Sequence, residues 1–247
     1  MKILVVGGTH GNERTGVDTV LELKRTPVVD VDTLIANPRA TKRCQRFIET
    51  DLNRSFGVQN PKSYEERRAL RLVNVLGQYD LIVEFHNTGS RTTCGIVTTQ
   101  EPTATQLRAI AHLGLDRIVI MPAGGHSLSS RNPLKTVSLE ISNGADRFSP
   151  EFFVRQIASL DCKMDTINPS GIEMYRYRGV RVSRTLLAKH GLEIRHFVDF
   201  QPIDQEGLKL FGLDITKRHV PFLVGTPEYG EDFAFNVAEI LEKGGRM

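Results

Sequence analysis

Apolar residues in the first two thirds of the chain follow two patterns that alternate. Short runs rich in Val and Ile, each bounded by Gly, Pro or Asn, have the character of buried strands. Between these runs, apolar residues recur at every third or fourth position, as they do on one face of a helix. The alternation predicts an α/β fold in which helices flank a mixed, largely parallel sheet.

The expected strands cover residues 3–6, 33–36, 81–85, 95–98, 118–121 and 137–141, and the expected helices cover residues 14–24, 64–76, 103–113 and 150–160. The last of these helices follows Ser149 and has Pro150 in its first turn, where proline is well tolerated. Open α/β sheets gather their binding residues at the carboxyl ends of the strands. Residues that directly follow a strand are therefore the first candidates for a site.

The pattern changes after about Asp161. Three stretches, INPSGIEMYRYRGVRV, LEIRHFVDF and VPFLVG, are predicted to be strands joined by turns, and residues 233–243 are predicted to be a closing helix. We therefore expect two domains, a main α/β domain at residues 1–160 and a smaller, β-rich domain at residues 161–247. Arg176, Arg178 and Arg181 favour a solvated strand face that protects a sheet edge, with anion binding as the alternative.

Composition and charge argue against several classes of protein, among them nucleic-acid-binding and membrane-anchored proteins. The 247 residues are 40% hydrophobic and 25% charged, with a net charge of +3 that is spread along the chain, so we expect no nucleic-acid partner. The chain has an odd number of cysteines, Cys44, Cys94 and Cys162, and none of them form a C-x-x-C motif. This pattern argues against a disulfide framework and favours a reducing, cytoplasmic location. The chain opens on the strand KILVV without a leader pattern, and no apolar run approaches ~18 residues, so no membrane anchoring is expected.

The first strand ends in VVGGTHGNERTG, where four glycines surround His10 and Glu13. Glycine permits close backbone approach, and His and Glu are good ligands for zinc. A third ligand is available in DLIVEFHNTG, because His86 follows an apolar strand of the same predicted sheet. Three ligands at two strand ends leave a fourth position for water, as a catalytic zinc site requires. The alternative is that His10 and Glu13 cap the following helix.

A second group of polar residues lies in NPRATKRCQRFIETDLNRSF, residues 37–56. Arg46, Asn53 and Arg54 offer planar guanidinium forks and an amide, which suit the carboxylate of an acidic small molecule. Surface arginines on a helix are the alternative, which explains Arg43 well. Among the other histidines, His126 is a candidate for a pocket loop, whereas the rest are expected at the surface or in satisfied core positions.

The stretches GGTHGNE, NPRA, DLNRSF and EFHNT resemble the aspartoacylase and succinylglutamate desuccinylase family of zinc-dependent N-acyl amino acid hydrolases, which are related in fold to the zinc carboxypeptidases. The spacing from Asn37 to Arg54 is similar to that of aspartoacylases. TVSLEIS and, more loosely, TPEYGEDFAF extend the resemblance. The resemblance implies a catalytic domain at residues 1–160 and a C-terminal domain that completes the substrate channel.

The resemblance also implies a role for individual residues. One zinc ion per chain is expected on His10, Glu13 and His86, with Glu140 as general base and Arg46 at the oxyanion. Substrate-binding roles are implied for Asn53 and Arg54 at the α-carboxylate, for Arg131 at a side-chain carboxylate and for Tyr229, which would close over the site. The sequence departs from the family's aspartoacylases at Ser127, where they carry Tyr, and the spacing from Arg131 to Glu140 is one residue shorter.

These residues predict hydrolysis of the amide of an N-acyl amino acid, with N-acetyl-L-aspartate as the leading substrate. N-succinylglutamate and, more distantly, peptides are alternative substrates, and a homo-oligomer is compatible with the chain. From another class, a non-catalytic zinc-binding ligand sensor would not require Glu140. A nucleotide-binding loop is disfavoured, because GGTHGNERTG lacks both the P-loop lysine and the G-x-G-x-x-G spacing.

Overall fold

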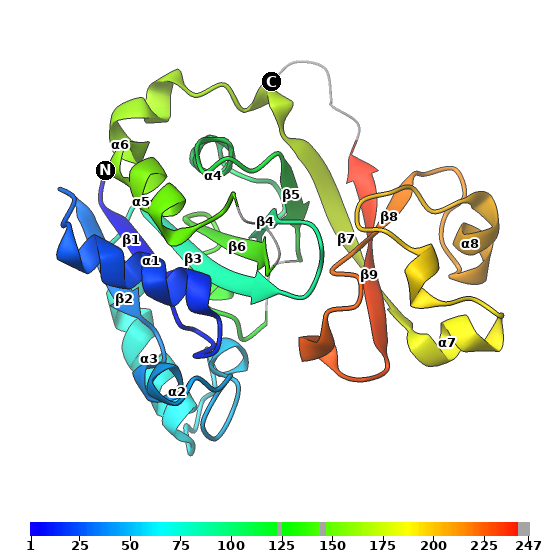
Figure 1. Cartoon of the computed structure of the whole chain (residues 1–247), viewed down its shortest axis with the longest axis horizontal. Helices are drawn as coiled ribbons and strands as arrows, with labels where there is room; N and C mark the ends of the chain where they lie inside the picture. Colours follow the sequence, from blue (N-terminus) through cyan, green and yellow to red (C-terminus); the bar gives the residue numbers. More distant parts are fainter. Residues whose placement is uncertain (123–124, 144–146, 242–247) are drawn as a thin grey trace.

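Nine strands form one sheet in the order β2-β1-β3-β6-β4-β5-β7-β9-β8 (Figure 1). The computed structural model describes residues 1–122, 125–143 and 147–241. The strands are β1 Ile3–Gly7, β2 Val31–Ile35, β3 Leu81–Thr88, β4 Cys94–Val97, β5 Arg117–Ile120, β6 Thr136–Ser142, β7 Glu173–Ser183, β8 His219–Phe222 and β9 Phe233–Leu241. The α-helices are α1 Arg14–Arg25, α2 Pro38–Arg43, α3 Tyr64–Leu76, α4 Ala104–His112, α5 Pro150–Ala158, α6 Leu160–Lys163, α7 Arg184–Lys189 and α8 Gln205–Leu210.

The sheet is largely parallel, as the alternating pattern predicts. Strands β2, β1, β3 and β6 run in the same direction, and β4 is antiparallel to β6. Strands β5 and β7 then run parallel to β4, and β9 is antiparallel to both β7 and β8. The predicted fold class is therefore confirmed. No helix in the described ranges is both long and apolar enough to cross a membrane.

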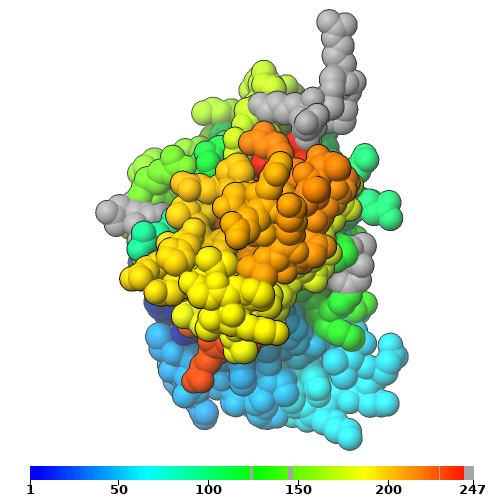
Figure 2. All heavy atoms as spheres, turned by 90° about the vertical axis from the view of Figure 1, so that its right-hand side faces the viewer, coloured from blue at the N-terminus to red at the C-terminus, as the bar shows by residue number. Residues whose placement is uncertain are grey.

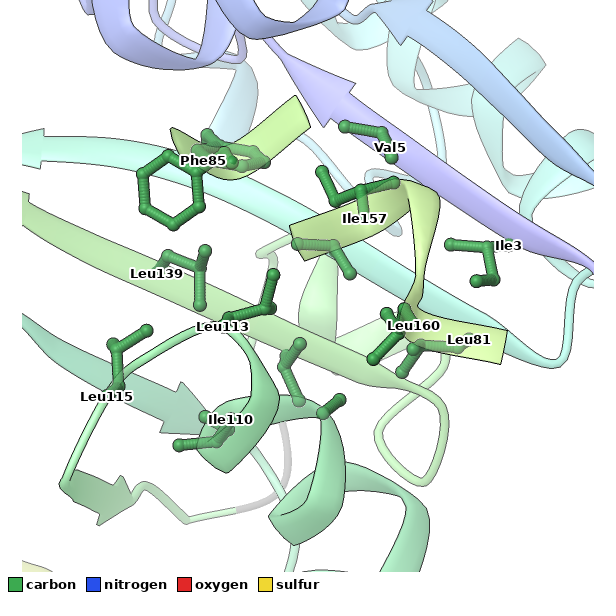
Figure 3. Close-up of a cluster of buried hydrophobic side chains, with 14 of the residues drawn as sticks. Ile3, Val5, Leu81, Phe85, Ile110, Leu113, Leu115, Leu139, Ile157 and Leu160 are labelled. Atoms are coloured by element: carbon green, nitrogen blue, oxygen red, sulfur yellow. The ribbon is translucent and has the colours of Figure 1, made fainter. Parts of the chain in front are cut away.

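The two faces of the sheet are covered by different helices, because successive strand residues point to opposite sides. Ile3 and Val5 of β1 belong to a core cluster with residues of α1, α4, α5 and α6, part of which is drawn in Figure 3. Leu4 and Val6 belong to a second cluster with residues of α3. Both faces of β1 are thus dry, which explains its uninterrupted apolar sequence.

The starts of α3, α4 and α5 each match a local signal in the sequence. Ser63 forms a capping box with Glu66 at the start of α3, and Thr103 forms one with Gln106 at the start of α4. Ser149 caps α5, with Pro150 in its first turn. The predicted bounds of α3 are confirmed, and those of α1, α4 and α5 differ by one or two residues.

The C-terminal portion differs from the prediction in several places, and it also contains two short helices, α7 and α8, that were not predicted. The predicted helix at residues 233–243 is wrong, because β9 is a strand bonded to β7 on one side and β8 on the other; residues 242–243 lie outside the described residues. The apolar groups of β9 contact core clusters on both faces of the sheet, so tertiary pairing overrides local propensity. LEIRHFVDF is also not a strand, since its regular part is a 3-10 turn, Ile194–His196.

Strand β7 lies between β5 and β9, so the expectation that its arginines protect an edge is wrong for Arg176, which is paired with Ile120 of β5. The pairing with β5 ends at Arg176, and Arg178 and Arg181 beyond it are exposed. Arg178 forms an ion pair with Glu239 of β9. The pairing of β5 with β7 also carries the sheet across residue 160, and one core cluster joins Val119 to Tyr175. The division into domains at residues 1–160 and 161–247 stays a prediction.

Replacement of Phe153 with Ala is expected to lower the free energy of unfolding by about 3–5 kcal/mol. The Phe153 ring is fully buried, and its centroid lies 4.9 Å from that of Phe85 and 5.7 Å from that of Phe148. Urea unfolding measures the change. Phe47→Ala is the control, because Phe47 is 39% exposed and its loss leaves no cavity in the core. Equal stability losses in the two variants would contradict this account.

Candidate active site

Three buried side chains meet at the carboxyl ends of β1 and β3. His10, Glu13 and His86 each offer one ligand atom, and these atoms all lie within 4.8 Å of one another. Glu13 Oε1 lies 2.7 Å from His10 Nδ1, and Glu13 Oε2 lies 2.9 Å from His86 Nδ1. Glu13 is the N-cap residue of α1, but its side chain makes no capping hydrogen bond and contacts the two histidines instead. The three ligands form a group that can hold a metal ion.

Close backbone contacts explain the glycines around this group. A Cβ atom on Gly7 would lie 2.2 Å from the carbonyl oxygen of Gly16, and one on Gly11 would lie 2.1 Å from the backbone of Ala40. The loop between β1 and α1 is therefore pressed against α1 on one side and α2 on the other. Glycine is needed at these positions for packing, and the packing places His10 and Glu13.

The outer nitrogens of both histidines face carboxylates. His10 Nε2 lies 3.0 Å from Asp51 Oδ1. His86 Nε2 is buried and lies 3.2 Å from Glu84 Oε1, without the alignment of a hydrogen bond. A carboxylate behind a histidine fixes the ring so that the other nitrogen faces the metal. Here Asp51 and Glu84 direct both Nδ1 atoms toward Glu13.

Glu84 is held by neighbours on both sides of β3. Its side chain is 1% exposed and accepts hydrogen bonds from Thr9 Oγ1 and Ser138 Oγ, both at 2.9 Å. In the β3–β6 register Glu84 is paired with Ser138, and His86 is paired with Glu140. The same register therefore brings Glu140 beside a candidate metal ligand.

The electrostatics of the group favour positive charge at its centre. Burial alone would raise the pKa of Glu13, but the adjacent His86 and His10 outweigh burial and lower it to about 2. Burial would likewise lower the pKa of His86, but Glu84 and Glu13 raise it well above its usual value. The pKa of Asp51 is lowered by His10 and Arg46 against the effect of burial. A divalent cation fits these residues, because it would supply the charge that the carboxylates demand.

Glu140 has the opposite environment. Its carboxyl group lies on β6, and burial raises its pKa to about 7, although His86 acts in the other direction. On the far side of β6, the register pairs Glu140 with the buried Cys94 of β4. A carboxyl group with such a pKa can both accept and release a proton near neutral pH.

A cavity of about 50 Å³ lies over the metal-ligand group. It is lined by His10, Glu13, Arg46, Asn53, Arg54, His86, Asn87, Glu140, Thr226 and Tyr229. Eight of the nine residues to which the family resemblance assigns a role line this cavity, and the ninth, Arg131, does not. Asn87 and Thr226 were not anticipated, although Asn87 directly follows His86. The other unanticipated residues, Asp51 and Glu84, do not line the cavity but hold the histidines from behind.

The three polar side chains from the segment after α2 have different partners. Arg46 Nη2 lies 3.1 Å from Asp51 Oδ2, and Arg46 Nη1 lies 3.7 Å from Glu13 Oε1. Asn53 Oδ1 accepts a hydrogen bond from the backbone of Leu128. Arg54 donates to the carbonyl oxygen of Asn53 and has no carboxylate within 4.0 Å in the described parts of the chain. Arg54 is thus the cavity guanidinium that is available for an external anion.

Arg131 lies beside the cavity rather than in it. Its Nη2 donates to the carbonyl oxygens of Phe56, at 2.8 Å, and Gly125, at 3.1 Å. The guanidinium fills the space next to Gly57, where a Cβ atom would lie 2.0 Å from it. His126, the pocket-loop candidate, likewise interacts with the carbonyl of Phe56 and does not line the cavity. Both side chains tie together two loops near the site.

Tyr229 reaches the cavity from the C-terminal portion, at the end of the 3-10 turn Pro227–Tyr229. Burial raises the pKa of its hydroxyl above the usual range, and Glu140 adds to the effect. Behind this turn, Asp199 accepts hydrogen bonds from Ser90 Oγ at 2.5 Å and from Val224 N at 2.8 Å. Asp199 thus joins the loop after β3 to the loop that carries Tyr229. Figure 2 shows the face on which the C-terminal portion (yellow to orange) covers the molecule.

The fold and the site together define an α/β protein with a candidate metal centre at the carboxyl edge of its sheet. The family model of the succinylglutamate desuccinylase/aspartoacylase catalytic domain matches residues 1–155. The chain therefore belongs to this family, as the sequence motifs predict.

Curated relatives match part of the chain. The chain is 38% identical to the aspartoacylase of Mus musculus over an alignment of 115 residues, and the match covers 39% of this chain and 37% of that protein. It is 39% identical to N-acyl-aromatic-L-amino acid amidohydrolase (carboxylate-forming) A of Danio rerio over an alignment of 109 residues, and the match covers 36% of this chain and 33% of that protein. The matched region thus spans about a third of each relative.

Solved structures match the whole fold. The succinylglutamate desuccinylase of Chromobacterium violaceum aligns with a TM-score of 0.74 and 14% identity, over 99% of this chain and 86% of that one. Murine aminoacylase 3 aligns with a TM-score of 0.71 and 23% identity, over 98% of this chain and 95% of that one. At these identities the structures support the fold alone.

Proposed function

We propose that the protein is a zinc-dependent hydrolase that cleaves the amide bond of an N-acyl amino acid, with N-acetyl-L-aspartate as the leading substrate. The observation that carries the proposal is the position of Glu140. This carboxyl group lies beside the ligand group of His10, Glu13 and His86, in one cavity with Arg46 and Arg54. Metal ligands, a general base and two cationic side chains are the groups that hydrolysis of a carboxylate-bearing amide requires.

Zinc suits the ligand set. Two imidazole nitrogens and one carboxylate are the donors of several catalytic zinc sites, in which the fourth position is left to water or substrate. When bound, one zinc ion per chain would act as a Lewis acid and lower the pKa of water to about 7. His10, Glu13 and His86 would hold it, and Asp51 and Glu84 would keep the two rings in place.

Glu140 performs the proton transfers in the proposed reaction. It accepts a proton from the attacking water as the water oxygen bonds to the acyl carbon. It then gives this proton to the amide nitrogen as the C–N bond breaks, so that a carboxylic acid and a free amino acid result. A base with a pKa near the working pH suits both steps, and the pKa of Glu140 is about 7.

The cavity arginines have separate roles in this proposal. Arg46 is held by Asp51, and a fixed cation of this kind stabilises the developing oxyanion; removal of one such donor typically costs about 3–4 kcal/mol. Arg54 and Asn53 would hold the α-carboxylate of the amino acid. Arg131 would contact a side-chain carboxylate only after it releases the carbonyls of Phe56 and Gly125.

Two other functions remain as alternatives. A desuccinylase acting on N-succinylglutamate would use the same machinery, and a side-by-side assay with N-acetylaspartate, N-succinylglutamate and a blocked dipeptide distinguishes the substrates. A non-catalytic zinc-binding sensor would keep the cavity but hydrolyse none of the three compounds. The position of Glu140 favours the enzyme.

His86→Ala is expected to abolish zinc binding. Wild-type protein should contain about one zinc ion per chain, and loss of one of three protein ligands leaves too few to hold the ion. Elemental analysis after gel filtration measures the content. His112→Ala is the matched control, because His112 contacts Gln156 and Ser159 and does not line the cavity. Full zinc occupancy in His86→Ala would refute the ligand assignment.

Glu140→Gln is expected to keep zinc and the folded state but to lose turnover by about 10²- to 10⁴-fold, because an amide cannot accept the proton. Steady-state assays with N-acetylaspartate, together with zinc analysis of the same sample, test this expectation. Activity within a few-fold of wild type would place the base elsewhere.

Arg54→Ala is expected to weaken all N-acyl amino acid substrates alike, because the α-carboxylate is common to them. Arg131→Ala is expected to lower kcat/KM for N-acetylaspartate, by an amount that corresponds to an activation free energy about 2–5 kcal/mol higher. The effect on kcat/KM for N-acetylalanine is expected to be much smaller. Both variants are assayed on both substrates. Equal losses on the two substrates in Arg131→Ala would instead assign this arginine to the tie between the loops of Phe56 and Gly125.

A further inference from the structure

A fully buried carboxylate lies outside the cavity, at the second residue of α3. Glu65 is 0% exposed, and each of its oxygens accepts two hydrogen bonds. Oε1 accepts from Asn37 Nδ2 at 3.1 Å and from Ile48 N at 2.7 Å. Oε2 accepts from Glu49 N at 3.2 Å and from Thr50 N at 3.3 Å. No lysine or arginine within the described ranges lies within 4.0 Å of it, so backbone and amide groups alone satisfy this carboxylate.

The three consecutive backbone donors lie in the segment from Arg46 to Asp51, and the residue at each end of this segment contacts the site. Arg46, two residues before Ile48, lines the cavity and contacts Asp51. Asp51, directly after Thr50, holds the outer nitrogen of His10. A segment whose N–H groups converge on one fixed carboxylate has little freedom to move, so both ends of this segment are positioned by Glu65.

The fourth donor links Glu65 to the loop of the metal ligands. Asn37 caps α2 through its Oδ1, which accepts from Ala40 N at 3.2 Å, and its Nδ2 donates to Glu65. Helix α2 in turn packs against Gly11, between His10 and Glu13. One carboxylate therefore joins α3, α2 and the segment from Arg46 to Asp51.

We propose that Glu65 is a positioning residue that sets the geometry of Arg46 and Asp51, and this proposal rests on the proposed function for its kinetic consequence. In Glu65→Gln, an NH₂ group replaces one oxygen and faces N–H donors instead of accepting from them. At least one pair of the four hydrogen bonds is thereby lost, and buried N–H groups without partners are costly. The segment then loses its fixed position.

Glu66→Gln is the matched control. Glu66 is the next residue of the same helix turn, and it accepts from the backbone of Ser63 and Lys62 as part of the capping box. Both substitutions remove one negative charge from the start of α3, so both weaken the helix terminus. Of the two side chains, only that of Glu65 bonds directly to the segment from Arg46 to Asp51 within the described residues, whereas Glu66 bonds to Ser63, whose hydroxyl contacts that of Thr50.

Hydrogen exchange measured by NMR on the full chain tests the positioning without reference to activity. The amides of Ile48, Glu49 and Thr50 are expected to exchange about tenfold faster in Glu65→Gln, which corresponds to about 1.4 kcal/mol of lost protection. In Glu66→Gln their exchange is expected to stay within about threefold of wild type. Unchanged exchange in Glu65→Gln would overturn the proposal.

Kinetics and zinc titration complete the test. With N-acetylaspartate, Glu65→Gln is expected to lower kcat by about tenfold or more, because Arg46 acts at the oxyanion, with a smaller effect on KM. Zinc affinity is expected to fall by about 10-fold, because Asp51 no longer orients His10. Equal kcat and zinc values in the Glu65→Gln and Glu66→Gln variants would refute the positioning role.

Failure of the proposed function and failure of the Glu65→Gln variant to fold can each be distinguished from failure of the positioning role. If wild-type protein hydrolyses no N-acyl amino acid, the proposed function fails, while exchange and zinc affinity still decide the role of Glu65. If Glu65→Gln does not fold, Glu65→Asp serves in its place, because it keeps the charge and shortens the reach by one methylene group. Faster exchange and weaker zinc binding than in Glu66→Gln support the proposal, and equality with Glu66→Gln overturns it.

Discussion

Three carboxylates, those of Glu13, Asp51 and Glu84, surround two buried imidazole rings, and this concentration of negative charge constrains the whole site. Buried charges of one sign persist only when cations or hydrogen-bond donors compensate them. The histidines and Arg46 compensate them in part, and a divalent metal would complete the balance. The pairing of β3 with β1 and β6 places Glu84 and His86 beside the loop after β1 and beside Glu140.

Sequence patterns predicted much of the core architecture because the signals are local. Buried strands have uninterrupted apolar runs, and the capping boxes at Ser63 and Thr103 mark helix starts without knowledge of the fold. The same holds for the candidate ligands, since His10 comes soon after β1 and His86 lies near the carboxyl end of β3. The position of Glu84 beside His86 could also have been predicted, because residues two positions apart in a strand point to the same face.

Other features depend on partners that are remote in the chain. Asp51 contacts His10, which is 41 residues away in the sequence, and Glu65 contacts Ile48, which is 17 residues away. The contacts of Asp51 and Glu65 therefore cannot be predicted from the few residues on either side of them. Strand β9 has a composition compatible with a helix, and only its pairing with β7 and β8 decides the outcome. The direction of the Arg131 side chain is likewise set by the carbonyls it meets, which no spacing rule specifies.

The continuity of the sheet through β5 and β7 limits how this protein can diversify. Tyr229 reaches the cavity from a portion that shares strand pairing and core with the first half, rather than from a module attached by a linker. A chimera that took residues 161–247 from a relative would have to match the twist and register of β5 as well as supply a cavity residue. New specificities in such a chain are therefore easier to reach by single substitutions around the cavity than by exchange of its C-terminal part.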